Sequence, residues 1–310
     1  SNRQELDMTR NLQKLEEQLR KQNISSRTFL ITGGNSGFGY LVARTLLRAG
    51  GRVILGCRSE KRARDACERL KVESGSQHLS YLLVDMENPK SISDCVEAVK
   101  SQQLHINVLV NNAGVSMVHT YIESPTGVEK TCQTNYLGLV QFTELMTPLL
   151  EREEDPRVIN VSSLTYVKGR PAVIDAQHLP LQRSEYERFN AYYRSKYLVT
   201  SYTQYYARQH PRVFAVACDP GVAATNIARE LGVIGWLYSR RFFQLFAPTW
   251  KGACTIAFAA GSEEVKSVCG SGKMCCKCRR KELIPAVCSK QEQDAIHDAT
   301  VELLKRTNVV

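Results

Sequence analysis

The stretch TGGNSGFG occupies residues 32–39, between the apolar run 28–31 and a helix-forming stretch. Its glycines are Gly33, Gly37 and Gly39. Glycines let a chain leave a buried strand, turn tightly and begin a helix whose free N–H groups face a phosphate. The same pattern also arises in turns that bind nothing. The stretch therefore predicts a strand, a turn and a helix, with a dinucleotide as the expected ligand. Whether a ligand binds there depends on the motifs in the rest of the chain.

Short apolar runs alternate with helical stretches along the chain. The runs are continuously apolar, as is typical of parallel strands that helices cover on both faces. The runs are 28–32, 52–57, 79–84, 106–110, 157–163 and 212–218, and the helical stretches are 38–49, 59–73, 89–103, 124–151 and 190–208. We predict an α/β protein with a single Rossmann-type, doubly wound parallel sheet and helices on both faces.

The domain organisation follows from the absence of a linker-like composition. No proline-rich or glycine/serine-rich segment divides the chain, so residues 24–310 are predicted to form one domain. Within residues 1–23, Met8, Leu12, Leu15 and Leu19 fall on one helical face and predict an amphipathic helix docked on the domain surface.

The overall composition indicates a globular intracellular protein. Of 310 residues, 43% are hydrophobic and 23% are charged, and the formal net charge is +10. The basic residues are scattered without interleaved aromatic side chains, which argues against nucleic acid as a partner. Eleven cysteines, an odd count, favour free thiols in a reducing compartment. We expect the cytoplasm or the cytoplasmic face of a membrane, and the start at Ser1 leaves a missing N-terminal anchor open.

Residues 226–249 are unusually apolar and contain Trp236, Phe242, Phe243 and Phe246. We favour a lid over an apolar substrate. The alternatives are a helix pair packed on the core and a surface that contacts a membrane.

Several polar residues are placed where a parallel sheet would bind a ligand. Asn111-Asn112-Ala113-Gly114 follows one strand, at the edge where open α/β sheets bind their ligands. Ser162-Ser163 closes the fifth strand, and Asn135 lies in the helix predicted nearby. Tyr192 and Lys196 are one helical turn apart and share a face. Each signal is weak alone, but together they form a constellation.

With these motifs the chain resembles the short-chain dehydrogenase/reductase family and, within it, the retinol-dehydrogenase-like group. The resemblance covers nearly all of the chain after residue 24. It depends on TGGNSGFG, Asp85, Asn111 to Gly114, Asn135, Ser163, Tyr192 to Lys196, Pro220-Gly221 and Thr225, which occur in the right order and spacing.

The resemblance implies hydride transfer between a nicotinamide cofactor and a carbonyl or alcohol carbon. Tyr192 would exchange the proton, and Lys196 would stabilise its phenolate and bind the nicotinamide ribose. Ser163, rather than its neighbour Ser162, would orient the substrate oxygen, and Asn135 would hold a water in the proton relay. The residues implied to contact the cofactor are Gly33, Asn35, Ser36, Gly37, Phe38, Gly39, Arg58, Asp85, Asn112, Ala113, Gly114, Tyr192, Lys196, Pro220, Gly221 and Thr225.

The end of the second predicted strand favours NADP(H) over NAD(H). An NAD site places a carboxylate there to bind the ribose hydroxyls, and none stands at residues 56–59. Arg58 and Ser59 instead offer a guanidinium and a hydroxyl for a 2′-phosphate, and Lys61 or Arg62 adds positive charge. The alternative is an Arg58 that points into solvent.

We predict no metal site. The C-terminal cysteines Cys269, Cys275, Cys276, Cys278 and Cys288 lack the paired spacing of a zinc site, and 271–277 is predicted as a final strand.

The function that the resemblance implies is an NADP(H)-dependent carbonyl reductase or alcohol dehydrogenase of lipid metabolism, with a retinoid-, steroid- or lipid-like substrate. Two other classes stay open: a catalytically silent regulatory protein that binds a dinucleotide, and a scaffold in peripheral contact with a membrane. The sequence also leaves open whether the protein is a homodimer.

Overall fold

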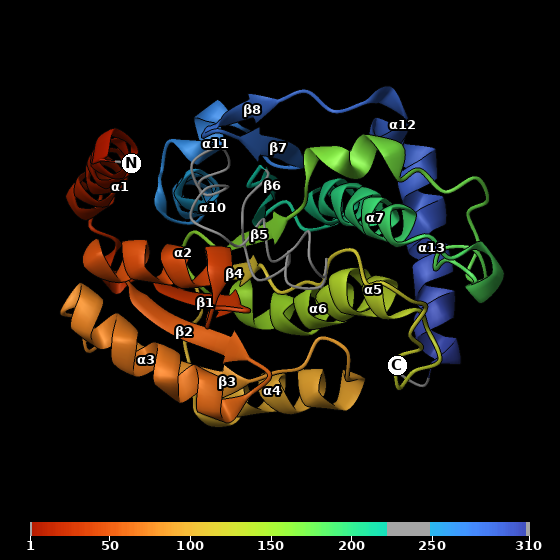
Figure 1. Cartoon of the computed structure of the whole chain (residues 1–310), viewed down its shortest axis with the longest axis horizontal. Helices are drawn as coiled ribbons and strands as arrows, with labels where there is room; N and C mark the ends of the chain where they lie inside the picture. Colours follow the sequence, from red (N-terminus) through yellow and green to blue (C-terminus); the bar gives the residue numbers. More distant parts are fainter. Residues whose placement is uncertain (1, 222–248, 308–310) are drawn as a thin grey trace.

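The computed structural model describes residues 2–221 and 249–307. Within them one sheet of eight strands has the order β3-β2-β1-β4-β5-β6-β7-β8 (Figure 1). The strands are β1 (Thr28–Thr32), β2 (Arg52–Cys57), β3 (Leu79–Leu83), β4 (Val108–Asn111), β5 (Arg157–Val161), β6 (Phe214–Asp219), β7 (Lys273–Cys276) and β8 (Arg279–Lys281). The first seven are parallel, which confirms the predicted fold class.

The order of the strands reverses at β1. This strand pairs with β2 on one side and with β4 on the other, so the chain crosses the sheet after β3. In open parallel sheets such a reversal leaves a crevice at the carboxyl ends of the strands, where ligands bind. The turn 32–39 lies at this point.

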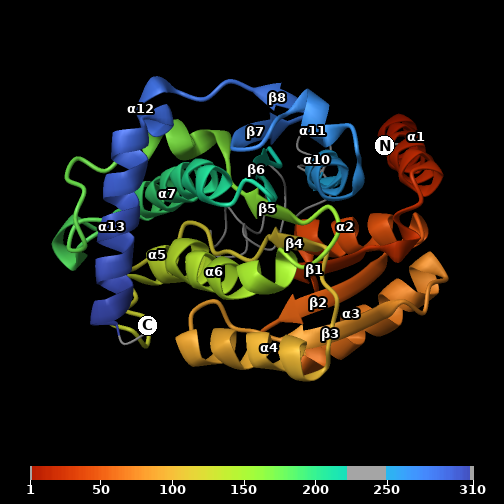
Figure 2. The same ribbon diagram turned by 180° about the vertical axis from the view of Figure 1, so that it is seen from behind.

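Helices cover both faces of the sheet (Figures 1 and 2). One buried apolar cluster joins the sheet to one group of helices, and a second joins it to the other. The first group is α4 (Pro89–Ser101), α6 (Gly138–Leu150), α7 (Arg188–Gln209) and α13 (Lys290–Arg306), and the second is α2 (Gly37–Arg48), α3 (Glu60–Ser74) and α10 (Thr249–Gly261).

The N-terminal helix α1 (Asn2–Lys21) packs against α2 and α10. Leu12, Leu15 and Leu19 are buried, as expected for the apolar face of an amphipathic helix. Gln18 Nε2 also donates to Glu264 Oε1 at 2.9 Å, beyond the end of α10. The helix therefore joins the beginning of the described chain to its last third.

The helices α10 and α13 were not predicted, and two further elements differ from those that the sequence predicts. The helix expected over 124–151 begins only at Lys130, as α5 (Lys130–Cys132). Residues 124–127 form a turn closed by the bond from Gly127 N to Ser124 O, and the Glu129 carboxylate accepts the Thr131 and Cys132 N–H groups that begin the helix. The second difference is β8, which is antiparallel to β7 and was not predicted.

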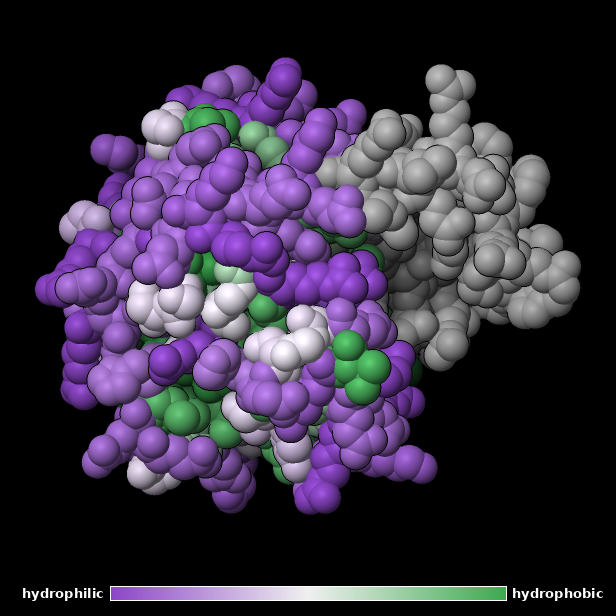
Figure 3. Space-filling view, turned by 90° about the vertical axis from the view of Figure 1, so that its left-hand side faces the viewer, coloured by the Kyte–Doolittle hydropathy of each residue, from purple (hydrophilic) through white to green (hydrophobic). Residues whose placement is uncertain are grey.

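The apolar segment 226–249 and Thr225 fall outside the described residues, apart from Thr249 at the start of α10. Among the described helices, none combines the length and apolar character needed to cross a membrane. The face seen in Figure 3 is covered mainly by hydrophilic side chains, with apolar ones in small groups. Described residues on this face therefore form no broad apolar patch of the kind that marks a membrane or partner surface.

Candidate active site

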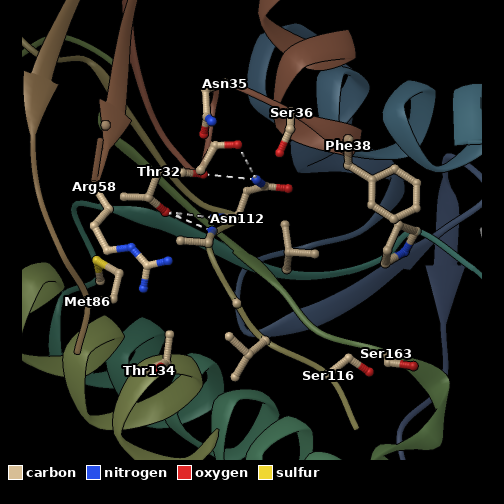
Figure 4. Close-up of a pocket in the computed structure, with 18 of the residues that line it drawn as sticks. Thr32, Asn35, Ser36, Phe38, Arg58, Met86, Asn112, Ser116, Thr134 and Ser163 are labelled. Atoms are coloured by element: carbon tan, nitrogen blue, oxygen red, sulfur yellow. Dashed lines mark hydrogen bonds between the residues drawn. The ribbon is translucent and has the colours of Figure 1, made fainter. Parts of the chain in front are cut away.

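A cavity of about 460 Å³ opens at the carboxyl ends of the parallel strands (Figure 4). Its walls come from the turn after β1, the ends of β2, β4 and β5, and the helix α7. The predicted contact residues that line it are Gly33, Asn35, Ser36, Gly37, Phe38, Arg58, Asp85, Asn112, Ala113, Gly114, Ser163, Tyr192, Lys196, Pro220 and Gly221. The structure thus brings together in one cavity residues that are widely separated in the sequence.

The glycine turn is shaped by close backbone packing. Gly33 has a φ of +66°, a conformation that side chains disfavour. Gly39 does not line the cavity, contrary to the prediction. A Cβ at Gly39 would lie 2.5 Å from the Gly33 carbonyl oxygen and 2.6 Å from Asn112 Nδ2. A glycine is therefore needed at residue 39 so that α2 can pack against the turn, rather than to admit a ligand.

Thr32 and Asn112 fix the turn to the neighbouring strand β4. The Thr32 hydroxyl accepts from the N–H groups of Asn112 and Ala113, each at 3.0 Å. Asn112 Nδ2 donates to the Thr32 carbonyl oxygen at 2.9 Å. These bonds, some of which Figure 4 draws, hold the ends of β1 and β4 in register below the cavity.

The N-terminus of α2 is left free to bind an anion. Ser36 is the N-cap residue, but its side chain makes no capping hydrogen bond to the helix. The first N–H groups of a helix lack partners within it and carry partial positive charge. Because Ser36 and Gly37 line the cavity, this helix end faces the space where a pyrophosphate would bind.

Arg58 directly follows β2, at the adjacent edge of the cavity. In Figure 4 it extends toward Met86 and Thr134, so it faces the cavity although 62% of its side chain is exposed. Its Nε is 3.9 Å from Asp85 Oδ2, a long and partly solvated ion pair. Ser59 and Arg62 also line this end. The alternative of an Arg58 directed only into solvent does not match this geometry.

Asn135 lies next to the cavity but does not line it. It sits in a π-helical turn, Gln133–Leu137, between α5 and α6. Its Nδ2 donates to the Val115 carbonyl oxygen at 2.9 Å and to Ser195 Oγ at 3.0 Å, while its Oδ1 accepts from Val115 N at 2.7 Å. Both amide hydrogens thus bind protein groups, and the side chain connects the segment after β4 to α7.

Ser163, Tyr192 and Lys196 meet at the end of β5. Ser163 Oγ lies close enough to the phenol of Tyr192 to lower its pKa, and it accepts from Thr165 Oγ1 at 3.0 Å. Lys196 is buried, its Nζ donates to the Val161 carbonyl oxygen at 2.8 Å, and it lies 5.6 Å from the centroid of the Tyr192 ring. Their common position on one face of α7 follows from their spacing of four residues.

Burial shifts the pKa values of both members of this pair. It raises the pKa of Tyr192 to about 12, against the neighbouring Ser163 hydroxyl, which lowers it. Burial also lowers the pKa of Lys196 to about 8. The stabilisation of a Tyr192 phenolate by Lys196 stays a prediction.

Ser162 and Ser163 both line the cavity, but they differ in exposure. The Ser162 hydroxyl bonds Thr200 Oγ1 at 2.7 Å and the Lys196 carbonyl oxygen at 3.1 Å, and 1% of the residue is exposed. Ser163 is partly exposed and lies next to Tyr192. This difference favours Ser163 over Ser162 as the residue that meets a substrate.

Sequence reasoning missed five polar residues around the cavity: Thr32, Ser116, Thr134, Thr165 and Asp219. Ser116 and Thr134 line it, and the hydroxyl of Thr134 is buried without a hydrogen-bond partner. Asp219 lies just behind it, 5% exposed, at the end of β6. The available signal was position alone, because Thr32 ends a predicted strand and Asp219 directly follows one.

The cysteines and histidines lie elsewhere. All eleven cysteines, each within the described residues, are free thiols. Cys275 and Cys276 belong to β7, which confirms a strand within 271–277, although β8 and not β7 is the last strand. Across residues 2–221 and 249–307 no group of three or more potential ligands is placed to hold a metal ion. His297 stacks on the Tyr205 ring, with centroids 4.0 Å apart.

The residues present fit a dinucleotide. The turn at Gly33 leaves no room for a Cβ, which would lie 3.1 Å from the Ala113 Cα, so backbone rather than side chains forms the floor. The uncapped end of α2 offers N–H donors, and the unpaired Thr134 hydroxyl offers a further polar contact. A phosphate-bearing ligand would satisfy these groups.

Comparison with known proteins identifies the family of this chain. Residues 27–174 match the family of short chain dehydrogenases. The chain is 37% identical over 198 residues to dehydrogenase/reductase SDR family member 12 of Bos taurus. The aligned residues are 64% of this chain but only 61% of the length of that protein. It is 30% identical over 257 residues to human retinol dehydrogenase 13, covering 81% of this chain and 76% of that protein.

Among solved structures, the fold is similar to that of an uncharacterised protein from Mycobacterium paratuberculosis. The TM-score is 0.71 at 24% identity, over 90% of this chain and 93% of that one. At this identity the likeness concerns the fold.

Proposed function

The chain belongs to the short-chain dehydrogenase/reductase family, and we propose that it is an NADP(H)-dependent oxidoreductase that interconverts a carbonyl and an alcohol on an apolar substrate. The observation that carries the proposal is the meeting of Ser163, Tyr192 and Lys196 in the cavity that also contains the glycine turn. A silent binding protein would have no chemical need for this arrangement.

When bound, the cofactor supplies the hydride. The residues that would hold it are the backbone of the glycine turn and the N-terminus of α2 for the pyrophosphate, with Asp85 and Asn112 on the adenosine side. Lys196 would bind the ribose of the nicotinamide. Pro220 and Gly221 line the cavity beyond β6 and would border the nicotinamide end of the cofactor.

The chain's own part in the reaction is the transfer of a proton at the substrate oxygen. With a pKa near 12, Tyr192 is protonated at neutral pH and is ready to donate its proton as negative charge develops on a carbonyl oxygen. Ser163, next to the same phenol, would orient that oxygen. Lys196 would remain a cation next to Tyr192 below pH 8 or so. We therefore propose reduction as the favoured direction.

Arg58 supports the choice of NADP(H). Its guanidinium faces the cavity, and its position at the end of β2 is where a 2′-phosphate would be read. A planar guanidinium binds phosphate through two parallel hydrogen bonds. Ser59 and Arg62 would complete a positively charged site. Asp85, at 3.9 Å, would keep Arg58 oriented without neutralising it fully.

The substrate class rests on the relatives. Retinol dehydrogenase 13 is named for a long apolar alcohol, and we propose a retinoid-, steroid- or lipid-like substrate for this protein too. The free cysteines support a role inside the cell.

A substrate panel tests the proposal. All-trans-retinaldehyde, a steroid ketone and a medium-chain aldehyde would each be incubated with the protein and NADPH or NADH, and cofactor oxidation would be followed by absorbance. We expect turnover of at least one apolar carbonyl with a preference for NADPH. NADPH binding without turnover of any carbonyl would favour the silent regulatory protein instead.

A further inference from the structure

A buried carboxylate stands directly behind the reaction centre. Asp219 ends β6, is 5% exposed and pairs in register with Cys276 of β7. It immediately precedes Pro220 and Gly221, which line the cavity. Removing a charge from water is costly unless hydrogen bonds or opposite charges compensate. Here the compensating groups are the Leu164 N–H next to Ser163, the Cys276 thiol and the ammonium of Lys196.

The carboxylate makes two hydrogen bonds, one with each oxygen. Oδ1 accepts from Leu164 N at 3.0 Å, and Oδ2 accepts from Cys276 Sγ at 3.4 Å. Leu164 follows Ser163 directly and begins the short helix η3 (Leu164–Lys168). The first bond therefore anchors the backbone next to the serine whose hydroxyl contacts Tyr192.

The charged and titratable groups that face Asp219 come from two elements. Tyr192 and Lys196 face it from α7, and Cys276 faces it from β7, with Lys277 and Lys281 acting on that thiol from farther out. The charge of Asp219 raises the pKa of Lys196 against the effect of burial, and it adds to the rise in the pKa of Tyr192. Both side chains are thus favoured in their protonated forms.

We propose that Asp219 is a positioning residue for the proposed reaction: through the Leu164 amide it fixes the Ser163 hydroxyl, and it is the buried negative charge that faces the ammonium of Lys196. The inference rests on the proposed function, since it assigns Ser163 and Lys196 their roles there. It adds a residue from β6 that acts through these two and does not itself touch the cavity.

Two substitutions separate the hydrogen bond from the charge. Asp219→Asn keeps an amide oxygen that can accept from Leu164 N but removes the charge, whereas Asp219→Ala removes both. Glu292→Gln is the matched control, because Glu292 is also a buried carboxylate, 8% exposed, and it bonds Tyr197 and Arg170 away from the cavity. Each variant of the full chain would be compared with wild type by two measurements.

The first measurement is amide hydrogen exchange over residues 163–168. We expect about tenfold faster exchange in Asp219→Ala, as loss of one buried hydrogen bond implies, and wild-type exchange in Asp219→Asn and Glu292→Gln. Unchanged exchange in Asp219→Ala would overturn the anchoring role. The exchange measurement needs no substrate, so it tests the anchoring role of Asp219 even if no carbonyl is turned over.

The second measurement is the pH dependence of kcat for reduction of all-trans-retinaldehyde by NADPH. In Asp219→Asn the fall of kcat at alkaline pH should move down by about one pH unit, because Lys196 loses its proton more easily. The KM for NADPH should stay within about twofold. A profile that superimposes on wild type would overturn the electrostatic role, and Glu292→Gln should leave the profile in place. A wild type inactive on this probe but with the expected exchange pattern would count against the proposed substrate and not against the anchoring.

Discussion

The two ends of the cavity hold their charges in opposite ways. At the adenosine end, Arg58 is 62% exposed and its ion pair with Asp85 spans 3.9 Å. At the reaction end, Lys196 is 7% exposed and its Nζ lies 2.8 Å from the Val161 carbonyl oxygen. Exposed charges keep ordinary properties and are screened by salt, whereas buried ones shift in pKa and are fixed in place. One end is thus suited to recognition and the other to chemistry.

Tyr192→Phe should have the largest effect, and only at the reaction end. Removing the phenol oxygen removes the proton donor, so kcat should fall by about a thousandfold, within the usual range for a general acid. NADPH affinity, measured by fluorescence titration, should change by less than about twofold. Tyr193→Phe is the matched control, since Tyr193 lies next along α7 but does not line the cavity. Near-wild-type turnover in Tyr192→Phe would contradict the proposed mechanism.

Substitution of the two adjacent serines, Ser162 and Ser163, tests the reaction end of the cavity in more detail. Ser163→Ala should lower kcat about a hundredfold, because the hydroxyl next to Tyr192 is lost. Ser162→Ala should largely keep turnover but lower the free energy of unfolding by about 1 kcal/mol, since Ser162 hydrogen-bonds Thr200 in the interior. Steady-state kinetics and urea unfolding would test both. A reversed pattern would assign the reaction to Ser162.

Arg58→Asp tests the adenosine end. The carboxylate should repel a 2′-phosphate, so KM for NADPH should rise by about tenfold or more while kcat changes little. KM for NADH should stay equal or improve. Arg64→Asp makes the same change of charge on α3, at a residue that bonds Glu60 rather than lining the cavity. A wild type that prefers NADH, or equal losses in both variants, would show that Arg58 does not select the cofactor.

The pH dependence should show the smallest effect. Lys196 has a pKa lowered from 10.5 to about 8, so it is charged below that pH and loses its proton above it. Tyr192, at about 12, stays protonated throughout this range. The kcat for reduction should therefore be level near neutrality and halved at about pH 8. The KM for NADPH should stay level over the same range, and a kcat that rises through pH 8 would refute the assignment.

The elements that position this cavity were predictable because their signals are local. Continuous apolar runs such as Phe29 to Ile31 can only be strands buried on both faces, and glycines mark the turn that follows. β8 could not be found in this way, because Arg279, Arg280 and Lys281 are exposed and carry no apolar pattern. The start of α5 was misplaced because it depends on one side chain, Glu129, that caps it.

The site was predictable where motif spacing determines contact and not where solvation does. Tyr192 and Lys196 share a face of α7 by their spacing alone. Their pKa values depend on burial, which the spacing does not reveal. Asp219 reaches Leu164 only because β5 and β6 are neighbours in the sheet. Tertiary proximity of this kind has no counterpart in the sequence.

The docking of α1 on α10 has a consequence for how the chain acquires its fold on the ribosome. Gln18 and Glu264, which bond each other, are 246 positions apart. At ordinary rates of translation, roughly 10 to 50 s separate their emergence. During that interval the leucine stripe of α1 can rest on α2 but lacks its second neighbour. The nascent protein thus carries a half-covered amphipathic helix for most of its synthesis.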